Sequence, residues 1–354
     1  MRQNRVMTIV AATGMLILIL DSRTALTGAA SGVELCIKTL IPSLFPFFVM
    51  SILLTDGLAG QNIPILKPLA AACKIPEGTE SALAIGFLGG YPVGAQNVSV
   101  LYQKGYLSRL EAMRMLVFCN NAGPAFIFGV LSSLFTQAIC CWYLWIIQMI
   151  SALAVGCFIP GCSDVKGRPF QMQKISMTDT IAKSVKVMSL VCGWVVFMRL
   201  LLEYASKWIL CYFPPVVQTV LCGILELSNG CIRLSEIQNE GLRFITASAL
   251  LSLGGVCVTL QTSAVSAGIP MGLYFPGKLL QCCISLIFSY VLQAVLPFSA
   301  TVCSFLPVTV CGIMATIIVL YLRYPKIMVA FRNLLVYNRR SYTKEVSSCC
   351  FTKK

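Results

Sequence analysis

The chain alternates between long apolar runs and short polar stretches, and most of the apolar runs have the length of membrane spans. About 20 apolar residues are needed to cross the hydrocarbon layer of a bilayer. We therefore expect an all-α polytopic membrane protein with about eight transmembrane helices. The predicted spans are residues 6–20, 35–54, 115–135, 139–158, 187–204, 244–260, 279–296 and 302–322.

Two further apolar runs contain residues that a lipid-facing helix should avoid. Residues 81–100 contain the glycine-rich stretch GFLGGYPVGA (86–95), and residues 216–231 contain GILELSNG (223–230). A related break, NNAGP (120–124), interrupts the predicted span 115–135. Irregular backbone at membrane depth is tolerated only where protein buries it or where it lines a wet cavity. We expect the two runs to be re-entrant, broken helical segments beside such a cavity.

The order of these pieces is the same in both halves of the chain. Each half contains a span, a glycine-rich broken segment, a short amphipathic piece, a broken span and an intact span. The first broken segment is predicted to enter from inside and the second from outside, which makes an inverted repeat typical of secondary transporters. The predicted divisions are a first span with an outer loop (1–32), a first gate-type repeat (33–160), a basic cytoplasmic loop (161–183), a second, inverted repeat (184–297), a last span (298–322) and a basic cytoplasmic tail (323–354).

Composition supports the membrane assignment. The chain is 57% hydrophobic and only 11% charged, whereas soluble domains carry about 25% charged residues. The net charge of +14 comes from basic residues in short loops and in the tail, as the positive-inside rule expects. This distribution predicts cytoplasmic termini and argues against a nucleic-acid partner. A short piece at 101–113, flanked by Arg114, is expected at the cytoplasmic surface; for residues 6–20, a cleaved signal peptide is the alternative.

No residue pattern indicates a metal, a cofactor or an enzyme. The absence of histidine removes the commonest metal ligand and the usual near-neutral proton carrier. The 18 cysteines lack paired metal spacing and are expected to pack as small core residues. The run GLYFPGK (272–278) has phosphate-loop spacing, but Leu279 stands where magnesium needs a hydroxyl.

Glu226 is the strongest candidate site residue. A carboxylate in an apolar helix costs about 2.5–3.5 kcal/mol and by default marks a functional site. The alternatives are an interfacial position or a structural pair with an arginine. Arg199 and Glu203, four residues apart, are expected to pair with each other. The predicted solute-binding residues are Asn120, Asn121, Glu226, Ser228, Asn229, Gln261 and Thr262; the asparagines could instead join helices.

The chain breaks supply candidate gates. Half-helix N-termini at such breaks can face an anionic group, and close packing of the Gly-xxx-Gly type is the alternative role for Gly86, Gly90 and Gly94. The predicted gate and hairpin residues are Gly89, Gly90, Tyr91, Pro92, Gly94, Gly123, Pro124 and Gly230.

Four runs together resemble one family: GGYPVGA (89–95), FCNNAGP (118–124), LELSNG (225–230) and IPSLFPF (41–47). It is the sporulation integral membrane protein family of endospore-forming bacteria, which carries the nucleoside-recognition, or gate, domain. The resemblance covers residues 32–322 and implies a transporter related in design to concentrative nucleoside carriers. It further implies movement of dipicolinate from the mother cell towards the forespore. The family has a histidine where this chain has Thr259, a departure that leaves substrate and proton coupling open.

We thus expect a secondary transporter for a small aromatic or heterocyclic solute in a bacterial plasma membrane. A nucleoside-like solute is the alternative, because Glu226 repels a dianion unless it is protonated or shielded. A non-transporting scaffold of spore-envelope assembly is the rival from another class. The expected partners are the solute and the lipid bilayer; a coupling ion (H+ or Na+) and a homo-oligomer stay open.

Overall fold

The computed structural model describes residues 2–58, 61, 63–159, 161, 176–266 and 268–295. The chain divides into a unit over Met1–Thr301 and a unit over Val302–Lys354, and all the described residues lie in the first. Every regular element in this described part is a helix, as the hydrophobic pattern predicts. The predicted span 302–322, the tail 323–354 and most of the basic loop 161–183 lie outside the described residues.

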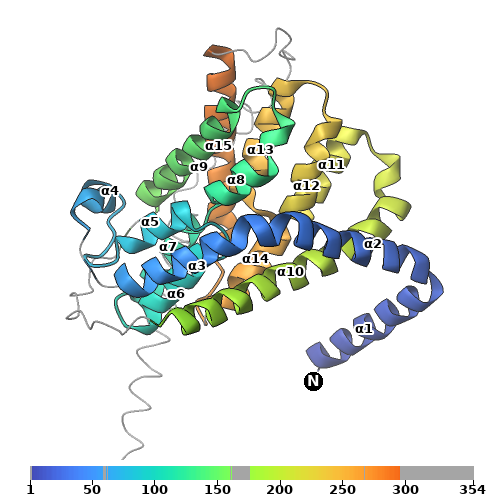
Figure 1. Ribbon diagram of the computed structural model, residues 1–354, viewed down its shortest axis with the longest axis horizontal. Coiled ribbons are helices and arrows are strands. Elements are labelled where there is room, and N and C mark those ends of the chain that lie inside the picture. Colours follow the sequence, from blue (N-terminus) through green and yellow to red (C-terminus); the bar gives the residue numbers. More distant parts are fainter. Residues whose placement is uncertain are drawn as a thin grey trace, which may run out of the picture. The chain divides into compact units, whose positions relative to one another are not determined.

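The helices of the described part come before and after residues 162–175 in the chain (Figure 1). Those before residue 160 are α1 (Arg2–Leu20), α2 (Ser22–Leu35), a π-helical turn (Cys36–Leu40), α3 (Ile41–Leu58), α4 (Lys67–Ala72), α5 (Ser81–Leu88), α6 (Val93–Gln103), α7 (Arg109–Phe118), α8 (Pro124–Val130) and α9 (Ile139–Phe158). Those after it are α10 (Met177–Trp208), α11 (Pro215–Leu225), α12 (Leu227–Arg233), α13 (Glu240–Leu253), α14 (Gly255–Val265) and α15 (Tyr274–Val295).

Five helical stretches of the described part are long and apolar enough to cross a membrane: Ser22–Leu58, Ile139–Phe158, Met177–Trp208, Glu240–Val265 and Tyr274–Val295. Large apolar side chains such as Trp142, Phe197 and Phe288 are exposed on them, which is the surface that lipid covers. The chain is therefore a multi-pass membrane protein. The count differs from the predicted eight because α1 and the half-helices are too short, and because residues 302–322 are not described.

The predicted outer loop before residue 33 is wrong, because the chain is helical again from Ser22. Asp21 caps α2 by accepting a hydrogen bond from the Thr24 amide at 3.4 Å. A Cβ atom built on Gly28 or Gly32 would lie 2.9 Å from the backbone of α10. Small residues one turn apart let two helices approach closely in a membrane. Their packing explains why α2 runs beside α10 (Figure 1).

The helix breaks predicted from glycine, proline and asparagine are confirmed. Residues 89–92 separate α5 from α6, residues 119–123 separate α7 from α8, and Glu226 separates α11 from α12. The α13 helix ends at Gly254, which has a φ of +73°, and α14 begins at Gly255 with a φ of +82°. Left-handed backbone of this kind favours glycine.

The breaks of the first half lie against each other. Gly90 has a φ of +75°, and a Cβ atom there would lie 2.9 Å from the Gly123 amide nitrogen. A Cβ atom on Gly123 would in turn lie 2.8 Å from the Gly90 Cα atom. Only glycine fits at this crossing, so the two residues fix where the hairpin α5–α6 meets the broken span α7–α8.

Arg114, which flanks the short piece predicted at the cytoplasmic surface, has a buried side chain. It is 2% exposed in α7 and pairs with Glu111, which is 1% exposed. Its guanidinium also donates to the Cys73 and Lys74 carbonyls, both at 2.7 Å. Both carbonyls directly follow the last residue of α4. The guanidinium therefore lies at a helix C-terminus, where positive charge is stabilised.

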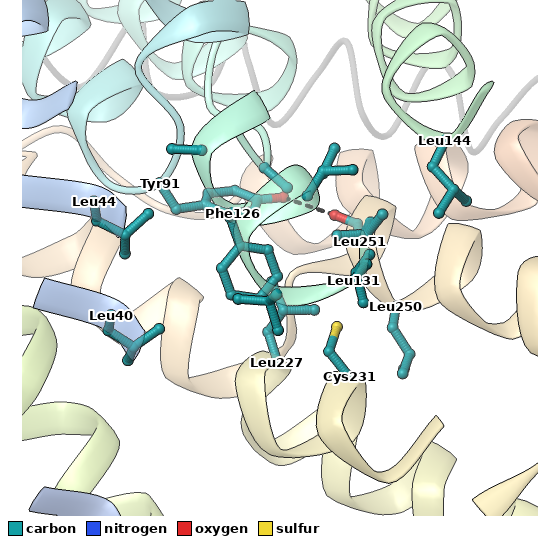
Figure 2. Packing of buried hydrophobic residues seen from close by; sticks show 14 of the residues in the cluster. Leu40, Leu44, Tyr91, Phe126, Leu131, Leu144, Leu227, Cys231, Leu250 and Leu251 are labelled. Carbon is teal, nitrogen blue, oxygen red and sulfur yellow. Dashed lines mark hydrogen bonds between the residues drawn. The ribbon is translucent and has the colours of Figure 1, made fainter. Parts of the chain in front are cut away.

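Cysteines behave as the sequence predicts. Of the thirteen free cysteines in the described residues, ten are buried. Cys36, Cys140 and Cys231 belong to the main apolar cluster, which joins helices of both halves. Figure 2 shows part of this cluster, with Tyr91 and Phe126 of the first half close to Leu227 and Leu251 of the second.

Candidate functional site

A cavity of about 40 Å³ lies where three of the chain breaks meet. Gly89, Gly90 and Tyr91 come from the α5–α6 break, and Ala122 and Gly123 from the α7–α8 break. The α11–α12 break supplies Glu226, Leu227 and Ser228, and α14 supplies Val258 and Gln261. The remaining wall is apolar and consists of Leu40, Leu44, Ala125, Phe126, Val191 and Val195.

The cavity in this conformation has room for water but not for a ring compound. A water molecule needs about 10–15 Å³ measured in this way, so about 40 Å³ holds a few waters. A larger solute can enter only after one of the wall segments moves. The two glycine-lined tips, Gly89–Gly90 and Gly123, are the wall segments that carry no side chains.

Glu226 faces the cavity as the residue that caps α12. Its side chain is 2% exposed, and its carboxylate accepts hydrogen bonds from the Ser228 amide (3.0 Å) and the Asn229 amide (2.7 Å). The Asn229 side-chain amide donates a third bond at 2.7 Å. A carboxylate at a helix N-terminus is stabilised both by these donors and by the helix dipole. The local sequence Glu-Leu-Ser-Asn thus builds its own site for a buried negative charge.

Arg199 of α10 connects to this carboxylate through one side chain. Its guanidinium donates to the Asn229 Oδ1 atom and, at 3.0 Å, to the Ser31 hydroxyl. The predicted pair of Arg199 with Glu203 is therefore replaced by these two contacts. The alternative reading of Glu226 as an arginine partner holds only indirectly, because Asn229 lies between the two charged groups.

Several predicted site residues line the cavity and others do not. Those on its wall are Gly89, Gly90, Tyr91, Gly123, Glu226, Ser228 and Gln261. Asn229 contacts Glu226 from behind it. Asn120, Asn121 and Thr262, predicted to bind solute, are buried in a neighbouring polar cluster. The other four lie outside the wall: Pro92 in the α5–α6 break, and Gly94, Pro124 and Gly230 in the helices α6, α8 and α12 that follow the breaks.

The polar cluster joins the broken spans of the two halves. The Asn120 side-chain amide donates to the Thr262 hydroxyl at 2.8 Å and to the Tyr274 hydroxyl at 2.9 Å. The Asn120 side-chain oxygen accepts a hydrogen bond from the Ala95 backbone amide at 3.2 Å. The Asn121 side-chain oxygen accepts from Gln281 at 2.9 Å. Both asparagines thus act as the polar connection between helices that was the alternative to solute binding.

Lys278 is the site residue that sequence reasoning missed. It is 0% exposed in α15, with its ammonium 5.3 Å from the centre of the Tyr91 ring. Because Tyr91 is also part of the cavity wall, a single aromatic ring connects Lys278 to the cavity. The available signal was a lysine at the start of an apolar run. It stands one residue before the predicted span, which begins at Leu279.

Tyr91 ties the first hairpin to the broken span of the second half. Its hydroxyl donates to the Leu251 carbonyl at 3.2 Å, the bond drawn as a dashed line in Figure 2. The Gln148 side chain of α9 donates to the same carbonyl at 3.0 Å, and Ser252 donates to Gln148 at 3.0 Å. The ring that closes one side of the cavity is therefore held at its far end by a hydrogen-bonded network.

Comparison with known proteins adds a partial similarity. No protein-family model matches the chain, and no solved structure matches it. Among curated proteins, the chain is similar to the sporulation integral membrane protein YlbJ of Bacillus subtilis (strain 168), with 34% identity over 109 residues. The matched part covers 30% of this chain and 27% of that protein, so the chain spans only about a quarter of the relative's length. Over that part, this membrane protein is similar to one named for sporulation.

Proposed function

We propose that the protein is a secondary transporter for a small aromatic or heterocyclic solute, with no catalytic step. The observation that carries the proposal is the meeting of three chain breaks at one cavity that contains the buried carboxylate of Glu226. A bilayer tolerates broken backbone and buried charge only at such places. Discontinuous helices around a site in the membrane interior are the usual architecture of secondary transporters.

The order of elements supports an inverted repeat. In the first half α3, α5–α6, α7–α8 and α9 follow one another, and α10, α11–α12, α13–α14 and α15 follow in the second. In this proposal the two hairpins enter from opposite sides of the bacterial plasma membrane and both termini are cytoplasmic. The full protein then has about eight spans, including residues 302–322, and the repeats correspond to a gate domain of the nucleoside-recognition type.

The chemistry of the wall favours a flat ring with polar groups. Tyr91 and Phe126 offer ring faces, while Glu226, Ser228 and Gln261 offer hydrogen-bonding groups. The resemblance to the sporulation family implies dipicolinate, and the similarity to a protein named for sporulation is consistent with this choice. A neutral nucleoside-like solute fits the carboxylate of Glu226 better, so both solutes belong in the test.

The test is uptake by proteoliposomes that contain the purified protein, with labelled dipicolinate and a labelled nucleoside measured side by side. We expect Glu226→Gln to lower uptake of the transported solute at limiting concentration by at least about tenfold. A hydrogen bond to a charged group contributes about 1.5–3 kcal/mol, and about 1.4 kcal/mol corresponds to a factor of ten. Glu34→Gln is the matched control, because Glu34 is 60% exposed and its ion-pair partner, Lys38, is 73% exposed.

The melting temperature of each variant separates loss of transport from loss of the helix cap. Saturable uptake that Glu226→Gln abolishes, and Glu34→Gln leaves intact, supports the transporter. If neither solute enters vesicles containing well-folded wild-type protein, the proposed solutes are wrong. The rival, a non-transporting scaffold of spore-envelope assembly, then becomes the better explanation.

A further inference from the structure

The ammonium group of Lys278 occupies a site made of neutral oxygen atoms. It donates hydrogen bonds to the Asn120 backbone carbonyl, to the Asn121 side-chain oxygen at 3.1 Å and to the Gln281 side-chain oxygen at 2.9 Å. The rings of Tyr91 and Tyr274 lie 5.3 and 5.8 Å from it and add cation–π attraction. None of the ion pairs among the described side chains includes Lys278.

The site lies at the end of a broken helix. Asn120 and Asn121 follow the end of α7, in the stretch where the backbone leaves the helix before α8. A helix C-terminus carries partial negative charge and unpaired carbonyls. In transporters with discontinuous helices, such half-helix ends and unwound carbonyls coordinate the coupling cation. The third oxygen comes from Gln281, one turn after Lys278 in the intact helix α15.

We infer that the Lys278 ammonium fills the position of a monovalent coupling cation between the α7–α8 break and α15. The protein therefore carries its own cation there and binds no Na+ at this position, whereas truncation of Lys278 opens a Na+ site. That such a cation drives transport rests on the proposed function. The cation site itself rests only on the oxygen atoms around Lys278.

A purely structural lysine makes a different prediction. Such a residue would only fill space and hold α15 against the break, and its removal would destabilise the protein equally in every salt. An ion site keeps its oxygen ligands after the ammonium is removed. The three oxygens can then bind a small cation with the same single positive charge as the ammonium, where the truncation leaves room for it.

The test is thermal unfolding of the purified full chain in detergent, in NaCl and in N-methyl-D-glucamine chloride at equal ionic strength. We expect Lys278→Ala to melt about 2–4 °C higher in NaCl. Wild type should show no such difference, because its own ammonium fills the site. Lys278→Met is the matched control, since its side chain occupies the space of the lysine stem without the charge, and it should not respond to Na+.

A second variant ties the Na+ response to the oxygens. Adding Asn121→Leu to Lys278→Ala should abolish the response, because one of the three ligands is lost. Lys278→Ser is measured in parallel for the case in which the alanine variant does not fold. Stabilisation of wild type by Na+ over the organic cation would overturn the inference, and so would truncated variants that melt alike in both salts.

The outcome is independent of any transported solute. A Na+ response of Lys278→Ala in a protein that moves neither dipicolinate nor a nucleoside would rule out both proposed solutes and keep the ion site. Saturable uptake by wild type, together with truncated variants that ignore Na+, would refute the ion site and keep the transporter.

Discussion

Replacing Arg114 by methionine should lower the free energy of unfolding by about 3–5 kcal/mol, the usual result of removing one partner of a buried ion pair. The Arg114 and Glu111 side chains are 3% and 1% exposed, and their charged atoms are 2.9 Å apart. The variant removes one cation from beside a buried carboxylate. It also removes the donor for the Cys73 and Lys74 carbonyls. Unfolding of the purified protein in mixed detergent micelles measures the loss.

Lys38→Met provides the control for this prediction. Lys38 and Glu34 also form an ion pair on one helix, but their side chains are 73% and 60% exposed. Such pairs contribute no more than about 1 kcal/mol. The double variant Glu111→Leu/Arg114→Met should be more stable than Arg114→Met alone, because the carboxylate that lost its cation is gone too. A stability of Arg114→Met within about 1 kcal/mol of wild type would show that the pair is not buried as described.

Replacing Gly94 by alanine should destabilise the protein by about 3 kcal/mol, at the upper end of the usual cost of overpacking. Gly94 lies in α6, where a Cβ atom would collide with the Cys119 carbonyl oxygen and lie 3.1 Å from the Asn120 Cα atom. Both are backbone atoms of the α7–α8 break, so no side-chain rotation relieves the clash. The hairpin would have to move away from the break that carries Asn120 and Asn121.

Gly193→Ala is the control, since Gly193 lies in α10 with no atom within 4 Å of the added methyl group. Alanine is favoured over glycine in a helix by about 1 kcal/mol, so this variant should be neutral or slightly more stable. Thermal unfolding of both variants beside wild type gives the comparison. Similar melting temperatures for the two variants would contradict the close approach of α6 to Cys119.

The breaks and their most polar residue could be predicted because the physics is local in the sequence. A glycine–proline cluster or a carboxylate inside an apolar run is costly in a bilayer wherever the rest of the chain lies. Glu226 even receives its donors from its own next three residues. The glycines at 254–255, where the backbone turns left-handed, interrupt α13–α14 for the same local reason.

Contacts between distant residues could not be predicted in this way. Lys278 and Asn121 are 157 positions apart in the chain, and Arg199 and Asn229 are 30 apart across two helices. The sequence gives equal reason to pair Arg199 with Glu203, four residues away on the same helix. Only the packing of α2 against α10 brings the Ser31 hydroxyl close enough to accept a hydrogen bond from the Arg199 guanidinium.

The sequence by itself determined that this is a helical membrane protein with broken segments, since apolar length and helix-breaking residues act on the chain where they stand. The tertiary structure decided which breaks meet, that Glu226 rather than Asn120 faces the cavity, and that Lys278 is buried among neutral oxygens. The meeting of the first two breaks depends on the close approach of backbones at Gly90 and Gly123. Such an approach is a property of two segments together and is encoded in neither of them alone.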